Sequence, residues 1–157
     1  MQRYLTKARW NACNAFPPMR DIFTRIVPKI SLSFFSGDAN SAYLPEYDII
    51  QLRHGDDWSM GEDLAHEMIH ATGHFSRLNR LRNINEICEE YVAMIGSGLL
   101  LVDAGVASRY SVLYFDIADE IYFQDSYNLA RDAASYLLRG PPKANILWLS
   151  DGIMIGR

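Results

Sequence analysis

Two histidines four residues apart, His66 and His70, form a short motif in which Glu67 directly follows the first histidine. On an α-helix, residues i and i+4 lie one turn apart on the same face, so both imidazoles can bind one metal ion. Imidazole is a good zinc ligand, and a catalytic zinc takes three protein ligands and a water. A glutamate at this place can take a proton from that water. We therefore expect His66 and His70 to bind Zn²⁺ and Glu67 to act as a general base.

The residues around the motif predict a helix of limited length. Ser59 and Glu62 have the spacing of a capping box, which predicts a helix start near Met60. Gly73 offers a left-handed residue at the other end of the helix. The side away from the histidines carries residues that can be buried, namely Leu64, Ala65, Met68, Ile69 and Thr72.

Two histidines alone bind zinc weakly, so the sequence should supply a third ligand. Metzincins place a histidine three residues after the glycine of their motif, but here that position holds Ser76. His74 directly follows Gly73, and it reaches the metal-binding face only if the helix continues through the glycine. We expect His74 to pack against the core or to support a ligand.

A helix expected over about residues 85–103 is a better source of the third ligand. Gluzincins such as thermolysin take a glutamate from a following helix at roughly this separation. We expect Glu90 to be that ligand, with Glu89 and then Glu86 as alternatives. Small residues follow that would let the two helices approach closely: Ala93, Gly96 and Ser97.

The composition suits one globular domain over residues 1–157, because 157 residues with 49% hydrophobic content can form a sizeable core. The net charge is 15 − 19 = −4, which argues against strong electrostatic binding to nucleic acid or to anionic membranes. One basic group remains at Arg77, Arg80 and Arg82. We interpret it as part of a solvated loop, with a phosphate-binding site as the alternative.

The two cysteines, Cys13 and Cys88, lie far apart and have no partner at zinc-ribbon or redox spacing. No disulfide framework is therefore expected, and Cys88 is expected in the core. The N-terminus has no apolar stretch of signal-peptide length, and no apolar run approaches the length of a membrane span. These features predict a cytoplasmic protein that does not span a membrane.

The period of the apolar residues changes along the chain from helical to alternating and back to helical. Besides the helix that carries His66, the expected elements are helices over 2–16 and 19–27, strands over 30–34, 42–44 and 49–52, and helices over 85–103, 110–123 and 126–139. An apolar segment over 146–155 suits packing on the core, a hairpin or a contact surface. This order predicts an α+β fold, with a small, mostly antiparallel sheet packed on the His66 helix and several C-terminal helices.

Residues 64–80, LAHEMIHATGHFSRLNR, closely resemble the metallopeptidase domain of ArdC-type antirestriction proteins. That domain belongs to the polyvalent-protein metallopeptidases of phages and conjugative plasmids, whose motif is HExxH followed by xxTGHxSRLxR. The family's next helix resembles EELVAELG, and residues 89–96 here read EEYVAMIG. Residues 42–52 resemble the family's strand pair and residues 130–137 its closing helix, so the likeness spans roughly residues 40–139.

The chain departs from the family pattern at two places. Met94 stands where the family usually has a glutamate, which leaves Glu89 and Glu90 as the ligand source on that helix. Residues 111–115, SVLYF, stand where the family often has HAAYI, so the histidine is absent and Tyr114 remains. A tyrosine at this position could stabilise an oxyanion, although a packed core aromatic is the alternative.

The resemblance implies a single-domain zincin of gluzincin type, acting as a zinc-dependent metallopeptidase of phage or plasmid origin in the host cytoplasm. A protein or peptide substrate would pair with a sheet edge at Ser41–Leu44 or Ile49–Arg53. One alternative is a zinc-stabilised binding protein that antagonises a host restriction or defence factor without catalysis. Another is a DNA-associated crosslink protease similar to the SprT type, which requires a basic groove near the zinc built from the three arginines of the 77–82 segment.

Overall fold

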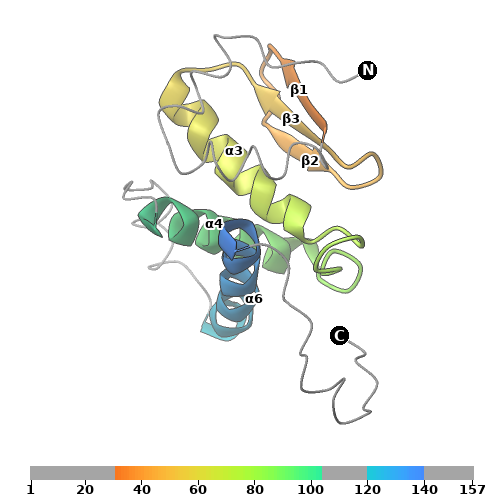
Figure 1. Cartoon of the computed structure of the whole chain (residues 1–157), viewed down its shortest axis with the longest axis vertical. Coiled ribbons are helices and arrows are strands. Elements are labelled where there is room, and N and C mark those ends of the chain that lie inside the picture. Colours follow the sequence, from red (N-terminus) through yellow and green to blue (C-terminus); the bar gives the residue numbers. More distant parts are fainter. Residues whose placement is uncertain (1–30, 104–119, 140–157) are drawn as a thin grey trace.

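The computed structural model describes residues 31–103 and 120–139, which form a three-stranded sheet and three helices (Figure 1). In chain order these are β1 (Ser31–Phe35), β2 (Ala42–Leu44), β3 (Ile49–Arg53), α3 (Asp57–Thr72), α4 (Glu86–Asp103) and α6 (Glu120–Arg139). The expected α+β class is confirmed. The helices expected over 2–16 and 19–27, the apolar segment over 146–155 and Tyr114 lie outside the described residues.

The sheet is mixed rather than mostly antiparallel. Its strand order is β1-β3-β2, and β3 runs parallel to β1 and antiparallel to β2. The turn after β2 reverses the chain, so that β3 enters between the two earlier strands with Ile50 opposite both Leu32 and Tyr43. Alternating apolar residues predict each strand but not its neighbours, which is why the expectation of a mostly antiparallel sheet was wrong.

The topology decides which strand can accept a further strand. Because β3 has a partner on each side, Ile49–Arg53 has no free edge, and that part of the expectation for substrate binding is wrong. β2 has one described neighbour and lies at the edge of the sheet on the α3 side (Figure 1). Within the described ranges, the segment Ser41–Leu44 therefore keeps the edge that strand addition requires.

α3 begins earlier than the sequence predicted. Its first residue is Asp57, and the side chain of Asp56 accepts a hydrogen bond from the Ser59 backbone N–H at 2.9 Å. The Ser59 hydroxyl also donates to Asp56, at 3.0 Å. Aspartate and serine cap helices about equally well, so the sequence offered two starts one turn apart, and the earlier one is used.

Gly73 ends α3, but not as a left-handed residue. Its φ and ψ are −76° and −7°, in the right-handed region. The glycine is required for space, because a Cβ there would lie 2.8 Å from Leu81 Cγ and 3.0 Å from Arg80 Nη2. The segment after the helix folds back against its last turn at this point, and the backbone N–H of Leu81 donates to the Gly73 carbonyl at 3.0 Å.

Arg77 attaches the end of α3 to the turn between β2 and β3. Its guanidinium donates to both carboxylate oxygens of Asp48 and to the Tyr43 hydroxyl, and its Nε donates to the Ala71 carbonyl at 2.6 Å. Asp48 has a positive φ of 52°, which an aspartate tolerates in a tight turn. The side chain of Arg77 is only 6% exposed, so it is not part of a solvated loop.

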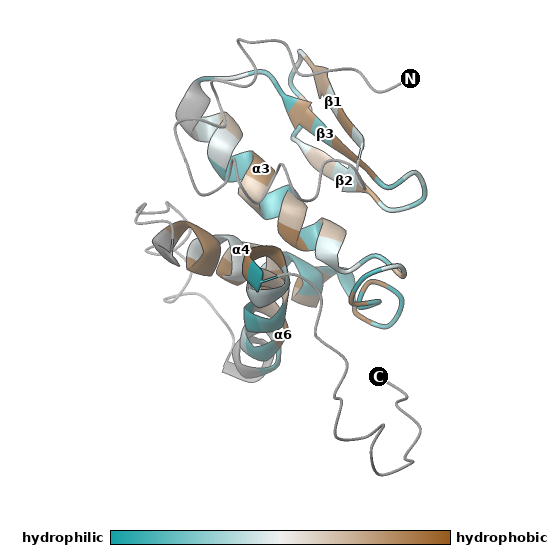
Figure 2. Ribbon diagram, in the orientation of Figure 1, coloured by the Kyte–Doolittle hydropathy of each residue, from teal (hydrophilic) through white to brown (hydrophobic). Residues whose placement is uncertain are grey.

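α4 packs against both α3 and α6, and Figure 2 shows that it is the most hydrophobic of the three helices. The side chain of Asn85 accepts from the Cys88 backbone N–H at 2.8 Å, which places the helix start where the sequence predicted it. Cys88 itself is only partly buried. α6 runs unbroken through residues 124–125, so the expected boundary between two helices there is wrong. None of the described helices is long and apolar enough to cross a lipid bilayer.

Candidate metal centre

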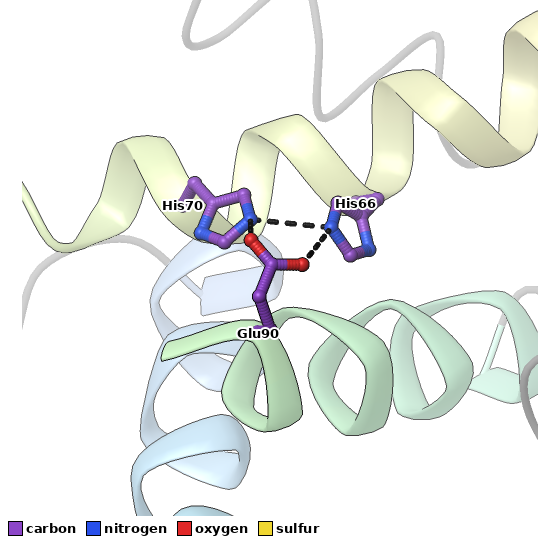
Figure 3. Close-up of side chains that lie close together, drawn as sticks. All are labelled: His66, His70 and Glu90. Atoms are coloured by element: carbon purple, nitrogen blue, oxygen red, sulfur yellow. Dashed lines mark hydrogen bonds and ion pairs between the residues drawn. The ribbon is translucent and has the colours of Figure 1, made fainter. Parts of the chain in front are cut away.

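The side chains of His66, His70 and Glu90 converge between α3 and α4 (Figure 3). The Nε2 atoms of the two histidines are 3.2 Å apart. The Glu90 carboxylate spans them, with Oε2 at 3.4 Å from His66 Nε2 and Oε1 at 3.3 Å from His70 Nε2. The three potential ligand atoms all lie within 4.8 Å of one another. The structure thus brings together the three residues that the sequence singled out as metal ligands.

The packing of α4 on α3 brings Glu90 to the histidines. A Cβ on Gly96 would lie 3.0 Å from Cδ1 and Cγ2 of Ile69, so the glycine lets α4 approach α3 at this point. Ala93 and Ser97 are fully buried on the same helix. The expectation that small residues on α4 allow a close helix approach therefore agrees with the structure.

The centre has the electrostatics of a cation site. Hydrogen bonds from His66 and His70 hold the pKa of the Glu90 carboxyl well below its usual range, although burial opposes the shift. Burial by itself lowers the pKa of His70, but hydrogen bonds to Glu89 and Glu90 and the charge of Glu67 outweigh it and raise the pKa to about 9. Both histidines are mostly buried, whereas the Glu90 side chain is 54% exposed. An ion can therefore reach the centre from the Glu90 side.

Glu89, the leading alternative to Glu90 as a ligand, contacts the other nitrogen of His70. Its Oε1 lies 3.0 Å from His70 Nδ1, and both of its oxygens accept hydrogen bonds of 2.7 Å from Arg80. Glu86, the third choice, is exposed and does not belong to the three-residue cluster. Glu89 is thus placed to orient His70, as carboxylates commonly do for metal-binding histidines.

Arg80 was misjudged from the sequence. Its side chain is only 5% exposed and its guanidinium is engaged by Glu89, which excludes both the solvated-loop and the phosphate-site interpretation for this residue. Of the three arginines in this segment, only Arg82 is exposed. Arg77 and Arg80 are both engaged in ion pairs. They therefore do not form the basic groove that a crosslink protease would require. Nothing in the SRLNR segment itself indicated that Arg77 and Arg80 are buried.

Glu67 lies beside the cluster but is not one of its three members. It is buried at 6% exposure, and burial raises the pKa of its carboxyl, partly offset by the charges on His70 and His66 and by the backbone N–H of Tyr43. A raised pKa makes a carboxylate a stronger base, which suits Glu67 to accept a proton from a group held at the candidate metal centre.

A cavity of about 920 Å³ opens over the cluster, between β2 and α4. Near the N-terminal part of α3 it is polar, where the Ser41 hydroxyl donates to Asp63 at 2.8 Å and accepts from the Arg53 backbone N–H at 3.0 Å. Leu81 and Ile84 line it beyond the C-terminal end of α3. The centre is therefore open to a molecule larger than water.

His74 is buried away from the cluster, and its Nδ1 lies 2.7 Å from the Ser76 hydroxyl. It accepts from the Ser76 backbone N–H at 3.3 Å and packs against the Phe75 ring. The residue therefore shapes the segment after α3, which agrees with the expectation of a packing histidine. The proposed role of Tyr114 concerns a residue outside the described ranges.

No protein-family model and no curated protein matches the sequence. Among solved structures, the chain is similar to the antirestriction protein ArdC from plasmid R388 in its Mn(II)-bound form, with a TM-score of 0.55 and 24% identity over 76% of this chain and 50% of that one. The metal-free form gives a TM-score of 0.56 and 22% identity over 78% and 51%. The chain thus spans about half the length of the ArdC protein, and the resemblance seen in the sequence is confirmed at the level of the fold.

Proposed function

We propose that this chain is a zinc-dependent metallopeptidase that hydrolyses peptide bonds of a protein substrate. His66, His70 and Glu90 are the proposed metal ligands. The observation that carries the proposal is the convergence of three donors while the carboxylate of Glu89, the residue next to Glu90 on α4, is held on the far side of His70. Three protein ligands with a free coordination position distinguish a catalytic zinc site from a structural one, which four ligands close.

The donor set is two imidazole nitrogens and one carboxylate oxygen, which suits zinc. The similar ArdC structure was solved with Mn(II), and manganese accepts the same donor types but binds nitrogen-containing sites less tightly than zinc. We therefore propose zinc as the resident metal. When bound, zinc polarises a carbonyl and lowers the pKa of a bound water toward neutrality.

Glu67 is the proposed general base. Its carboxyl is buried next to the proposed ligands, and its raised pKa makes it a stronger base, so it can take a proton from the attacking water and return it to the leaving amine. The substrate would lie extended in the cavity beside β2, whose edge is available for main-chain hydrogen bonds. The polar wall near Asp63 and the apolar wall near Leu81 would contact side chains on the two sides of the cleaved bond.

The biological setting proposed from the family likeness is a phage or plasmid protein that acts in the host cytoplasm against a restriction or defence protein. The chain spans about half of ArdC, so the activity of that whole protein is carried over only as part of this proposal. A binding protein that blocks its target without cleavage would share the fold and the metal. The two mechanisms differ in whether Glu67 matters.

The test is the Glu67→Gln variant, with Glu46→Gln as the matched control on an exposed turn. Both variants should retain zinc by elemental analysis and melt like the wild type. Glu67→Gln should lose about a hundred- to ten-thousand-fold in cleavage rate, as removal of a general base typically does. Host cells expressing each form are compared by mass spectrometry of protein fragments. Full biological effect of Glu67→Gln, with no fragments specific to the wild type, would show that the protein acts by binding.

A further inference from the structure

Glu89 and Glu90 are neighbours in sequence, and both carboxylates contact His70 from opposite sides of its ring. Glu90 Oε1 lies 3.3 Å from Nε2, whereas Glu89 Oε1 lies 3.0 Å from Nδ1. We propose that Arg80 is the positioning residue that separates their roles. It holds Glu89 on Nδ1 of His70 and leaves Glu90 as the only carboxylate ligand from α4. The inference rests on the metal site of the proposed function, but not on catalysis.

Arg80 engages both oxygens of Glu89. Nε donates to Oε2 and Nη2 donates to Oε1, each at 2.7 Å, in the bidentate geometry that makes arginine–carboxylate pairs strong. The two side chains are 5% and 7% exposed. If Glu89 turned toward a metal ion, it would break both hydrogen bonds and leave a buried guanidinium without its counter-charge, which is costly. Glu89 is therefore kept from joining the metal.

Arg80 is in turn fixed to the helix that carries His70. Its Nη1 donates to the Thr72 hydroxyl at 3.1 Å and its Nη2 donates to the Ile69 carbonyl at 2.9 Å. The guanidinium occupies space that a side chain at position 73 would take, since a Cβ on Gly73 would lie 3.0 Å from Nη2. Glu89 comes from α4, so this arrangement ties one residue of α4 to the last turn of α3.

The consequence falls on the ring of His70. When Nδ1–H donates to Glu89, the neutral imidazole carries its free electron pair on Nε2, which faces Glu90 and His66. Arg80 thus selects the ring nitrogen that binds the metal without touching the ion. By withholding Glu89 it also limits the ligands contributed by the described residues to three, which leaves a position free for water or substrate.

The test uses Arg80→Met in the full chain, with Arg82→Met as the matched control, an exposed arginine of the same segment. Zinc affinity is measured by competition with a chromophoric chelator. Arg80→Met should weaken binding by about 10- to 100-fold, as changes next to a ligand typically do, whereas Arg82→Met should match the wild type. Nitrogen-15 NMR of the zinc-free protein, recorded above the His70 pKa of about 9 so that the ring is neutral, should show the Nδ1–H tautomer of His70 in the wild type and in Arg82→Met, but a mixture of tautomers in Arg80→Met.

Loss of folding could mimic this result, so a second variant separates the two effects. Arg80→Met combined with Glu89→Leu removes both buried charges together, which should restore the melting temperature toward that of the wild type. Zinc affinity should stay reduced, because Nδ1 of His70 still lacks its acceptor. Wild-type zinc affinity in this double variant would overturn the proposal and leave the pair a purely structural role. Absence of zinc binding by the wild type would instead overturn the proposed function itself.

Discussion

Two arginines three residues apart, Arg77 and Arg80, have nearly the same surroundings but different partners. Their side chains are 6% and 5% exposed, each donates to a carbonyl near the end of α3, and each pairs with a carboxylate. The hairpin pair, Arg77–Asp48, joins α3 to the turn between β2 and β3. The metal-side pair, Arg80–Glu89, joins α3 to α4, and its glutamate also contacts His70.

The comparison shows that burial and charge pairing do not by themselves reveal a role in a site. Both guanidiniums also lie where a cation is favourable, at the C-terminal end of a helix. The two pairs differ in the second residue that the carboxylate contacts besides its arginine. Asp48 also accepts a hydrogen bond from the hydroxyl of Tyr43, a residue of the sheet. Glu89 instead contacts His70, a proposed metal ligand. Breaking either pair should lower stability, but only the metal-side pair should change metal affinity.

The largest effect should come from removing the histidines on which the comparison depends. His66→Ala or His70→Ala should abolish most zinc binding, because one ligand fewer leaves a two-donor site. Zinc should raise the melting temperature of the wild type but not of either variant, since a ligand stabilises only the state that binds it. Elemental analysis and thermal melts with and without zinc measure both effects. Stoichiometric zinc in the His66/His70 double variant would place the metal elsewhere.

The second-largest effect should be a difference in zinc affinity between variants of the two neighbouring glutamates. Glu90→Gln removes a proposed ligand and should weaken zinc affinity more than Glu89→Gln, which perturbs only the orientation of His70. Glu86→Gln serves as the reference, since that side chain is exposed and outside the cluster. Chelator competition gives the order of the three affinities. If Glu89→Gln proved the most damaging, Glu89 would be the ligand and the assignment of the two carboxylates would be reversed.

Arg77→Met should destabilise the fold by about 3 kcal/mol, the lower end of the cost of leaving one partner of a buried pair alone. Its zinc affinity should remain within about twofold of the wild type, because no atom of the hairpin pair contacts a proposed ligand. Urea unfolding and chelator competition on the same preparation measure the two quantities. A loss of zinc affinity as large as that expected for Arg80→Met would remove the distinction between the pairs.

The smallest effect is a change in acid stability at the hairpin pair. Burial alone raises the pKa of Asp48, but hydrogen bonds from Arg77 and Tyr43 outweigh it, so the folded-state pKa is lowered. A carboxyl of this kind stabilises the fold above its unfolded pKa of about 3.9 and loses that contribution as the pH falls through the folded value. Asp48→Asn should be less stable than the wild type at pH 6, and the difference should shrink below pH 4. Urea unfolding from pH 2 to 6 tests it, and a constant difference would contradict it.

The convergence of the three candidate ligands was largely predictable because two of them are neighbours on one helix. His66 and His70 are brought together by the geometry of one helix, and Glu90 follows from the small residues that mark the face of α4 nearest α3. The start of α4 was predictable for the same reason, since Asn85 caps its own helix. The histidine pair and the helix start need only residues within a turn or two of one another, whereas Glu90 lies twenty positions beyond His70 and its assignment also used the gluzincin pattern.

The arginine pairs were not predictable from the same kind of reasoning. Asp48 lies 29 positions before Arg77, and neither residue carries a pattern that indicates the other. Charge in a polar segment reads as solvated unless the fold supplies a buried partner, and here the fold supplies two. The parallel pairing of β1 with β3 was not predictable for a similar reason, because strand periodicity contains no information about which strand lies beside which.

The contact between Gly96 and Ile69 acts as a spacer that sets how far Glu90 stands from the histidines. Adding one methyl group at position 96 would force Ile69 or the whole of α4 to shift by a few tenths of an ångström. If α4 is what shifts, the Glu90 carboxylate would move away from both imidazoles together, although nothing at the centre itself had changed. Positions 69 and 96 should therefore tolerate substitution only in step, with a larger residue on α4 matched by a smaller one on α3, such as Gly96→Ala with Ile69→Ala.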